Sequence, residues 1–334
     1  MNSPAASPHP PNTKLQWKRV FSSQDWASIF VNMFIVVGLI VTSQLSDAAD
    51  RTFFTYDATI ANEYHPKSTI PFWLAIVIPL LCMLLSLVVY EYVAYKRNMN
   101  FISTTSVVAS ALYFFLDFCF AAVVTSLLTE VSKLLVGRFR PDWLSRCQPV
   151  TNSTIIPSWG LSPTENAACT NSEIPQSKLE DGRKSFPSGH ASNAFAMGVY
   201  ISGYVMYCTY FRAARKYSSN KKEGTWLQRV VHEMGTALSF LWILFNLSWA
   251  WGVSISRVID NKHHPSDIIG GSFLGTIIGG AFVLRAIPRH FIVIPDDEIE
   301  DGHHQSKYQQ QQPLLFGGNT NNRVVTANTS RLDA

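Results

Sequence analysis

The feature that most constrains this chain is a series of apolar runs, each about 20 residues long, which is enough for a helix to cross a bilayer. Polar segments separate six such runs, at residues 26–45, 71–95, 105–128, 190–211, 234–253 and 266–284. The fourth and fifth are the weakest, because Ser, Thr, Tyr or Asn interrupt them. The pattern predicts an all-α membrane protein with six transmembrane helices.

The composition agrees with a membrane domain. Only 15% of the 334 residues are charged, against about 25% in soluble proteins. The net charge of +4 is spread over short loops, whereas a nucleic-acid-binding protein concentrates its charge in a polar domain. We expect a membrane domain over 26–293, between a disordered N-terminal segment over 1–25 and a disordered tail over 294–334.

The distribution of Lys and Arg predicts the orientation in the membrane, because cytoplasmic loops carry an excess of both. The segment before the first run, the loops at 96–104 and 212–229, and the segment after the last run are all basic. Alternation of six spans puts these four segments, and both termini, in the cytoplasm. The membrane would be the plasma membrane or an internal membrane. The loops at 46–70, 129–189 and 255–265 then face the extracytoplasmic side.

Three polar clusters border the apolar runs on that extracytoplasmic side. They read KLLVGRFRP from Lys133 to Pro141, KSFPSGH from Lys184 to His190, and SRVIDNKHHPSD from Ser256 to Asp267. We single out four of their cations, which lie on the side where the charge rule disfavours them, namely Lys133, Arg138, Arg140 and Arg257. Arg guanidinium groups bind phosphate oxygens through charged hydrogen bonds. The clusters therefore predict one site for an anionic group at the membrane interface.

The second and third clusters carry side chains suited to phosphoryl transfer. The turn at Gly189 opens a span, so backbone N–H groups there can face an anion and Ser188 can add a hydroxyl. Equally, Ser188 can be an ordinary N-cap, with His190 incidental. Asp267 follows His263 by four residues and can orient a neutral imidazole for nucleophilic attack. Alternatively, Asp267 caps the last span and His263 is a solvated loop residue.

A metal site is the other alternative, with His190, His263, His264 and Asp267 as ligands. It is disfavoured because the neighbouring cations would repel a metal ion, and no tight ligand motif is present. We therefore expect neither a metal nor another cofactor.

The loop at 129–189 carries two further signs of an extracytoplasmic location. Asn152 begins an acceptor sequence for N-glycosylation, which is used only in the lumen. Cys147 and Cys169 lie in the same loop, and a disulfide between them would fit an oxidising compartment.

Glycine recurs at every fourth position of the last run, at Gly271, Gly275 and Gly279. This spacing places the three residues on one helix face, where they would allow close approach of a neighbouring span. The alternative is that these glycines are ordinary small residues of a span, with no role in helix contact.

At the three clusters the sequence closely resembles the lipid phosphate phosphatases of the type 2 phosphatidic acid phosphatase superfamily. That superfamily's pattern is K-x6-R-P, P-S-G-H and S-R-x5-H-x3-D. It is matched here from Lys133 to Pro141, from Pro187 to His190 and from Ser256 to Asp267. The resemblance covers about residues 26–290 and implies a magnesium-independent phosphoric monoester hydrolase with its active site at the extracytoplasmic interface.

The resemblance also implies a role for each matching residue. His263 would be the nucleophile that forms a phosphohistidine, with Asp267 orienting it. His190 would protonate the leaving alkoxide and then activate water. The phosphate would be bound by Lys133, Arg140, Ser188, Gly189 and Arg257. The role of Arg138 is left open.

Membrane lipids are the expected substrates and partners, because every cluster lies at a span end, at headgroup depth. The candidates are phosphatidate, lysophosphatidate, sphingosine-1-phosphate, ceramide-1-phosphate and diacylglycerol pyrophosphate. One alternative is a phosphatase or phosphotransferase of the same superfamily acting on a soluble phosphate. Another is a non-catalytic lipid-binding relative, which the retention of every motif residue disfavours. No nucleic acid is expected, and a homo-oligomer is compatible with the sequence.

Overall fold

The computed structural model describes residues 16–22, 24, 26–45, 48–97, 103–149, 160–162, 169–212 and 226–293. The expected glycosylation site at Asn152, most of the N-terminal segment and the tail over 294–334 lie outside these residues. Part of the N-terminal expectation is wrong. Helix α1 occupies Trp17–Ser22, where Val20 is fully buried and the Gln16 N–H donates to Thr105 Oγ1, so packing on the membrane domain orders this segment.

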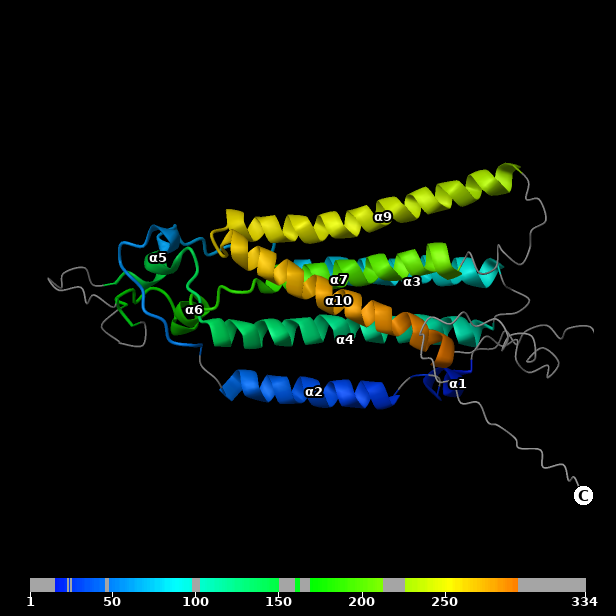
Figure 1. The fold of residues 1–334 in the computed structure, drawn as a ribbon, viewed down its shortest axis with the longest axis horizontal. Coiled ribbons are helices and arrows are strands. Elements are labelled where there is room, and N and C mark those ends of the chain that lie inside the picture. The colour runs from blue at the N-terminus through cyan, green and yellow to red at the C-terminus, as the bar shows by residue number, and fades with distance from the viewer. Residues whose placement is uncertain are drawn as a thin grey trace, which may run out of the picture. The chain divides into compact units, whose positions relative to one another are not determined.

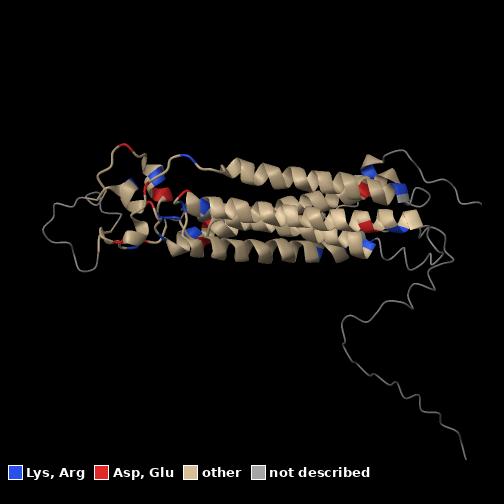
Figure 2. Cartoon of the chain, turned by 90° about the horizontal axis from the view of Figure 1, so that it is seen from above, with Lys and Arg blue, Asp and Glu red and all other residues tan. Residues whose placement is uncertain are grey.

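Long helices form at all six predicted runs (Figure 1). They are α2 (Trp26–Leu45), α3 (Phe72–Arg97), α4 (Thr104–Val136), α7 (Gly189–Met206), α9 (Trp226–Ile259) and α10 (Pro265–Val293), with α7 continued by the π-helix η2 (Tyr207–Arg212). Among the described residues, four helices are long and apolar enough to cross a membrane, namely α3, α4, α9 and α10. Figure 2 shows the charged residues gathered toward the ends of the helices.

Two helices are longer than predicted, and this moves two cluster residues. Helix α4 continues to Val136, so Lys133 lies in its last turn. Helix α9 continues to Ile259, so Arg257 lies on a helix rather than in the expected loop at 255–265. The reason is local: each cation is paired with an acid three residues away, Lys133 with Glu130 and Arg257 with Asp260. Pairs at this spacing stabilise a helix.

Gly137 ends α4 and turns the chain toward the second half of the first cluster. It has a φ of 58°, in the left-handed region that glycine adopts at helix ends, and its N–H donates to Lys133 O. A Cβ at this position would lie 2.2 Å from Ala49 O. Only glycine therefore fits between the end of α4 and the segment at 48–50.

Helix α7 lies at the centre, in contact with α3, α4, α9 and α10. The α10 glycines provide its closest approach. A Cβ would lie 2.6 Å from Ser188 O at Gly271, 2.1 Å from Ser192 O at Gly275 and 2.2 Å from Ala196 O at Gly279. The predicted glycine face is therefore confirmed as a backbone-to-backbone contact between α10 and α7.

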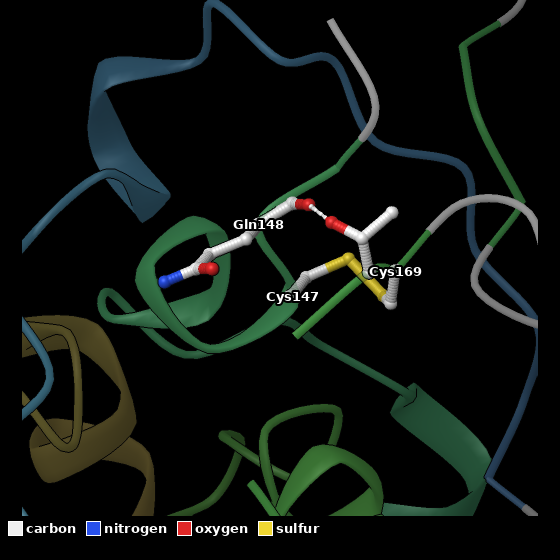
Figure 3. The surroundings of a disulfide bond; sticks show 4 residues. Cys147, Gln148 and Cys169 are labelled. Atoms are coloured by element: carbon white, nitrogen blue, oxygen red, sulfur yellow. Dashed lines mark hydrogen bonds between the residues drawn. A yellow bond between two sulfur atoms is a disulfide. The ribbon is translucent and has the colours of Figure 1, made fainter. Parts of the chain in front are cut away.

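We call the end at which α4 ends and α7 begins the loop end. It carries the short helices η1 (Ala58–Ile60), α5 (Trp143–Cys147) and α6 (Gln176–Asp181). A second apolar cluster joins η1 and α5, in which Ile60, Phe53 and Phe139 pack with Trp143 and Cys147. A disulfide connects Cys147 with Cys169 (Figure 3), which confirms the pairing considered from the sequence. It ties α5 to the segment before α6.

Loss of this disulfide is expected to destabilise the loop end. The bond closes a loop of 22 residues, and loops of this size contribute about 3 kcal/mol by restricting the unfolded chain. The double variant Cys147→Ser, Cys169→Ser should therefore unfold at a lower temperature than the wild type in detergent. Cys119→Ser, which replaces an unbonded cysteine of α4, is the control. Equal unfolding temperatures for the double variant and the wild type would contradict this prediction.

Candidate active site

The three clusters meet at a cavity of about 320 Å³ at the loop end. It is lined by six of the residues singled out from the sequence, namely Lys133, Arg140, Gly189, His190, Arg257 and His263. Both histidines thus face the same cavity, although they are distant in the sequence. Of the eight residues to which the resemblance gives a role, the other two, Ser188 and Asp267, are fully buried next to it.

His263 is held by a backbone carbonyl. Its Nδ1 lies 2.7 Å from Ser185 O, and because a carbonyl only accepts, Nδ1 carries the proton. The lone pair is then on Nε2, the atom suited to attack. Asp267 Oδ2 is 3.7 Å from Nδ1, beyond a hydrogen bond, so its charge favours this tautomer without a direct bond. The sequence interpretation named Asp267 and missed Ser185.

The imidazole of His263 is neutral at neutral pH. Burial lowers its pKa to about 4, and the charges of Arg140 and Lys133 act in the same direction. Asp267 opposes the shift and is outweighed. A neutral imidazole is the form that can act as a nucleophile, so the environment of His263 is compatible with that role.

Asp267 is a buried hub rather than a simple partner of His263. Its Oδ2 accepts from Ser185 Oγ at 2.6 Å and from the His264 N–H at 2.9 Å. Its Oδ1 accepts from Arg138 Nη1 at 2.7 Å. The bond to His264, the residue before α10, caps that helix, as the alternative interpretation expected. The other part of that interpretation, a solvated His263, is wrong, because His263 is only 4% exposed. Arg138, whose role was open, holds Asp267 and is not among the residues lining the cavity.

Each cluster cation that lines the cavity already has a carboxylate partner. Lys133 Nζ lies 2.6 Å from Glu130 Oε1, and Arg140 Nη2 lies 2.7 Å from Asp181 Oδ1. Asp260 Oδ2 is 2.6 Å from Arg257 Nη2. The pairs hold the cations at the cavity in the absence of a ligand. An anion entering the cavity would compete with these carboxylates.

His190 lies between the cations and an aromatic wall. Its Nε2 is 3.4 Å from Arg257 Nη1, and its ring meets the edge of Phe72 at 5.1 Å between centroids. It occupies the first turn of α7, directly after Gly189. This position places its ring beside the cation cluster from a helix that four neighbours hold in place.

At Ser188 the structure favours the ordinary N-cap over a hydroxyl that faces the bound anion. The Ser188 hydroxyl accepts from the Ala191 N–H at 3.5 Å, so it is the N-cap of α7, and it does not line the cavity. Gly189 does line it. A Cβ on Gly189 would lie 3.3 Å from Lys133 Nζ, so a side chain there would crowd the lysine.

Several lining residues escaped sequence reasoning. Tyr64 comes from the loop between α2 and α3, and its ring is flanked by Arg146 Cζ at 4.6 Å and Lys262 Nζ at 4.3 Å from its centroid. Lys178 and Asp181 come from α6. In the sequence, the one sign that such residues reach the site was Lys262, which adjoins His263 in the third cluster.

Among the described residues, no group of three His, Cys, Asp or Glu is placed to hold a metal ion.

The α2–α3 loop is tied to the third cluster as a wall of the site. Asp260 accepts from the Thr69 N–H at 2.9 Å and from Thr69 Oγ1 at 2.5 Å. The Lys262 ammonium donates to His65 O. These bonds fix a loop that has no motif of its own against the segment that carries His263.

Known proteins resemble this chain over most of its length. Phospholipid phosphatase 1 of Rattus norvegicus is 31% identical over 243 residues, covering 70% of this chain and 74% of the relative. Diacylglycerol pyrophosphate phosphatase 1 of Saccharomyces cerevisiae is 29% identical over 245 residues, covering 72% of each chain. Lipid phosphate phosphatase 2 of Arabidopsis thaliana is 28% identical over 225 residues, covering 66% of this chain and 63% of the relative.

The matched regions span from 60% to 74% of the length of the curated relatives. No solved structure matches the chain. The family model of the PAP2 superfamily matches residues 114–290. This range is more than half of the chain and contains all three clusters that line the cavity, and the chain therefore belongs to the PAP2 superfamily.

Proposed function

We propose that this protein is a magnesium-independent lipid phosphate phosphatase, a phosphoric monoester hydrolase acting through a phosphohistidine on His263. The observation that carries the proposal is the cavity itself, where His190 and His263 face one space lined by Lys133, Arg140 and Arg257. The relatives named as phosphatases of phospholipids, lipid phosphates and diacylglycerol pyrophosphate support the same class of substrate.

In the first step, His263 Nε2 attacks phosphorus and the ester P–O bond breaks. For this step His190 must carry a proton, and the negative charge of the bound phosphate favours the protonated ring against burial and the repulsion of Arg257, 3.4 Å away. His190 gives that proton to the leaving alkoxide, so the alcohol departs neutral. The three cations stabilise the transferring phosphoryl group, and charged hydrogen bonds of this kind contribute about 1.5–3 kcal/mol each. The Nδ1 proton stays on the ring, bonded to Ser185 O, while His263 carries the phosphoryl group.

In the second step, His190 takes a proton from water, and the resulting hydroxide attacks phosphorus. The N–P bond breaks, inorganic phosphate leaves and His263 returns to its neutral form. His190 is then protonated again for the next substrate. Arg257, which pairs with Asp260 and lies 3.4 Å from His190, is placed to bind a phosphate oxygen close to that ring.

The substrate is a lipid because of where the cavity lies. Six membrane spans, with both termini in the cytoplasm, put the loop end at the extracytoplasmic headgroup region. A phosphate on a lipid reaches this depth while its chains stay in the hydrocarbon. Phosphatidate, lysophosphatidate, diacylglycerol pyrophosphate, sphingosine-1-phosphate and ceramide-1-phosphate all meet this requirement.

The direct test is phosphate release by the purified protein with magnesium chelated. We expect release from a panel of lipid phosphates in mixed micelles at an undiminished rate, and little from glucose-6-phosphate. Release from glucose-6-phosphate alone would point to a soluble substrate. A protein that binds phosphatidate but releases no phosphate would be a non-catalytic relative, and the proposal would be wrong.

A further inference from the structure

On the side of the cavity away from the loop end, two polar side chains line it, and we call them the floor. Ser126 and Asn193 line it from α4 and α7. Ser126 precedes Lys133 by seven residues on α4, which corresponds to about 10 Å along a helix. Asn193 follows His190 by three residues, or almost one turn of α7. The floor thus lies further from the loop end, deeper along the helices, than the groups that would bind the phosphate.

The two side chains of the floor are bonded to each other and keep capacity for a ligand. Ser126 Oγ donates to Asn193 Oδ1 at 2.8 Å, and Asn193 Nδ2 donates to Gly189 O at 3.0 Å. The Ser126 oxygen can still accept, and the second amide hydrogen of Asn193 can still donate, with no described residue taking either. Asn193 is only 1% exposed, so this spare capacity is buried at the cavity.

Burying the Ser126 hydroxyl and the Asn193 amide at the cavity costs free energy unless a hydrogen-bond partner is present there. In the proposed reaction the cations hold the phosphate at the loop end, and the chains of the lipid extend the other way, into the hydrocarbon. The first carbons of the leaving alcohol therefore pass the depth of Ser126 and Asn193. In a glycerolipid these carbons carry oxygen: a free hydroxyl in lysophosphatidate and an ester in phosphatidate.

We propose that Ser126 and Asn193 form a subsite for the leaving alcohol, which binds the oxygen next to the phosphoester in a glycerol backbone. The inference rests on the proposed function and specifies the substrate class as glycerol-based lipid phosphates. It gives the protein a means to prefer these substrates over alkyl phosphates of equal chain length.

The test compares lysophosphatidate with octadecyl phosphate, which has a similar chain and no glycerol, in the same mixed micelles. For Ser126→Ala we expect kcat/KM to fall about tenfold on lysophosphatidate, as for the loss of one hydrogen bond. On octadecyl phosphate the change should stay within about twofold, because the carbon next to its phosphoester carbon bears no oxygen for Ser126 to bind. Inhibition by vanadate, which occupies only the phosphate position, should not change.

The matched control is Ser132→Ala. Ser132 lies on the same helix, does not line the cavity and donates only to Leu128 O of its own helix, at 2.7 Å. It should leave both substrates unaffected. Asn193→Ala is a second variant, expected to show the same selective loss where it folds.

The outcomes separate the subsite from the function on which it rests. If the wild type hydrolyses neither substrate, the proposed function fails. If the wild type hydrolyses both and Ser126→Ala slows both equally, Ser126 has a structural role and the subsite is overturned. No change on either substrate overturns it as well.

Discussion

His263→Ala is expected to lower phosphate release from lipid phosphates by about 10⁴-fold or more, while the protein still inserts and folds. Removing the nucleophile of a covalent mechanism leaves only binding and electrostatic stabilisation by the remaining site. Those groups persist in the variant, because Lys133, Arg140 and Arg257 keep their own carboxylate partners. Release of inorganic phosphate from phosphatidate measures the loss.

Rapid quench with phosphate-labelled substrate tests the intermediate itself. The wild type should retain acid-labile label on the protein, and His263→Ala should retain none. His264→Ala is the matched control, because its ring bonds Phe139 O at 3.2 Å and does not line the cavity. We expect His264→Ala to keep at least about a tenth of the activity, as for the loss of one hydrogen bond. Label on His263→Ala, or phosphate release at the wild-type rate, would refute the assigned nucleophile.

The meeting of the clusters could be predicted because each borders an apolar run. Hydropathy located the runs, and alternation then placed all three clusters at the same end of the helices. The cavity that Lys133, His190 and His263 share agrees with that reasoning. Helix ends were predicted less well. At Arg257, the polar residues that follow an apolar run predict a loop, whereas the pairing of Arg257 with Asp260 lets α9 continue to Ile259.

The remaining contacts of the site cannot be predicted from the spacing of residues in the sequence. The group that fixes His263 is the carbonyl of Ser185, and every residue has a carbonyl. Asp181 and Tyr64 reach the cavity from long loops, whose path the disulfide and the second apolar cluster decide. By contrast, the pairing of Lys133 with Glu130 was visible in principle, because acids and bases three apart on a helix face each other.

Packing between α7 and α10 supports the site in addition to its polar bonds. Helix α7 carries His190 in its first turn, and α10 carries Asp267 in its own. The Ser188 N–H donates to Asp267 O at 3.1 Å, which joins the two helix starts directly. A change in the distance between these helices would therefore move both sides of the proposed active site relative to each other.

Gly275→Ala is expected to force that change. Its Cβ would lie 2.1 Å from Ser192 O and 2.9 Å from Ser192 C, and these are backbone atoms that cannot rotate away. The helices must separate, at a cost on the order of 3 kcal/mol for such overpacking. We expect a lower unfolding temperature in detergent, and at least about a tenfold loss of phosphate release because the reacting groups are displaced.

Gly280→Ala is the control that distinguishes this clash from a general effect of losing glycine. It lies on the same helix, and its added Cβ would be 4.0 Å from the nearest side-chain atom, Val199 Cγ1, an ordinary contact. Because alanine also favours a helix more than glycine does, Gly280→Ala should be neutral or slightly stabilising. If Gly275→Ala behaved as Gly280→Ala does, the backbones of α7 and α10 could not be in contact. The shared cavity of His190, on α7, and His263, just before α10, would then need another explanation than the close packing of these two helices.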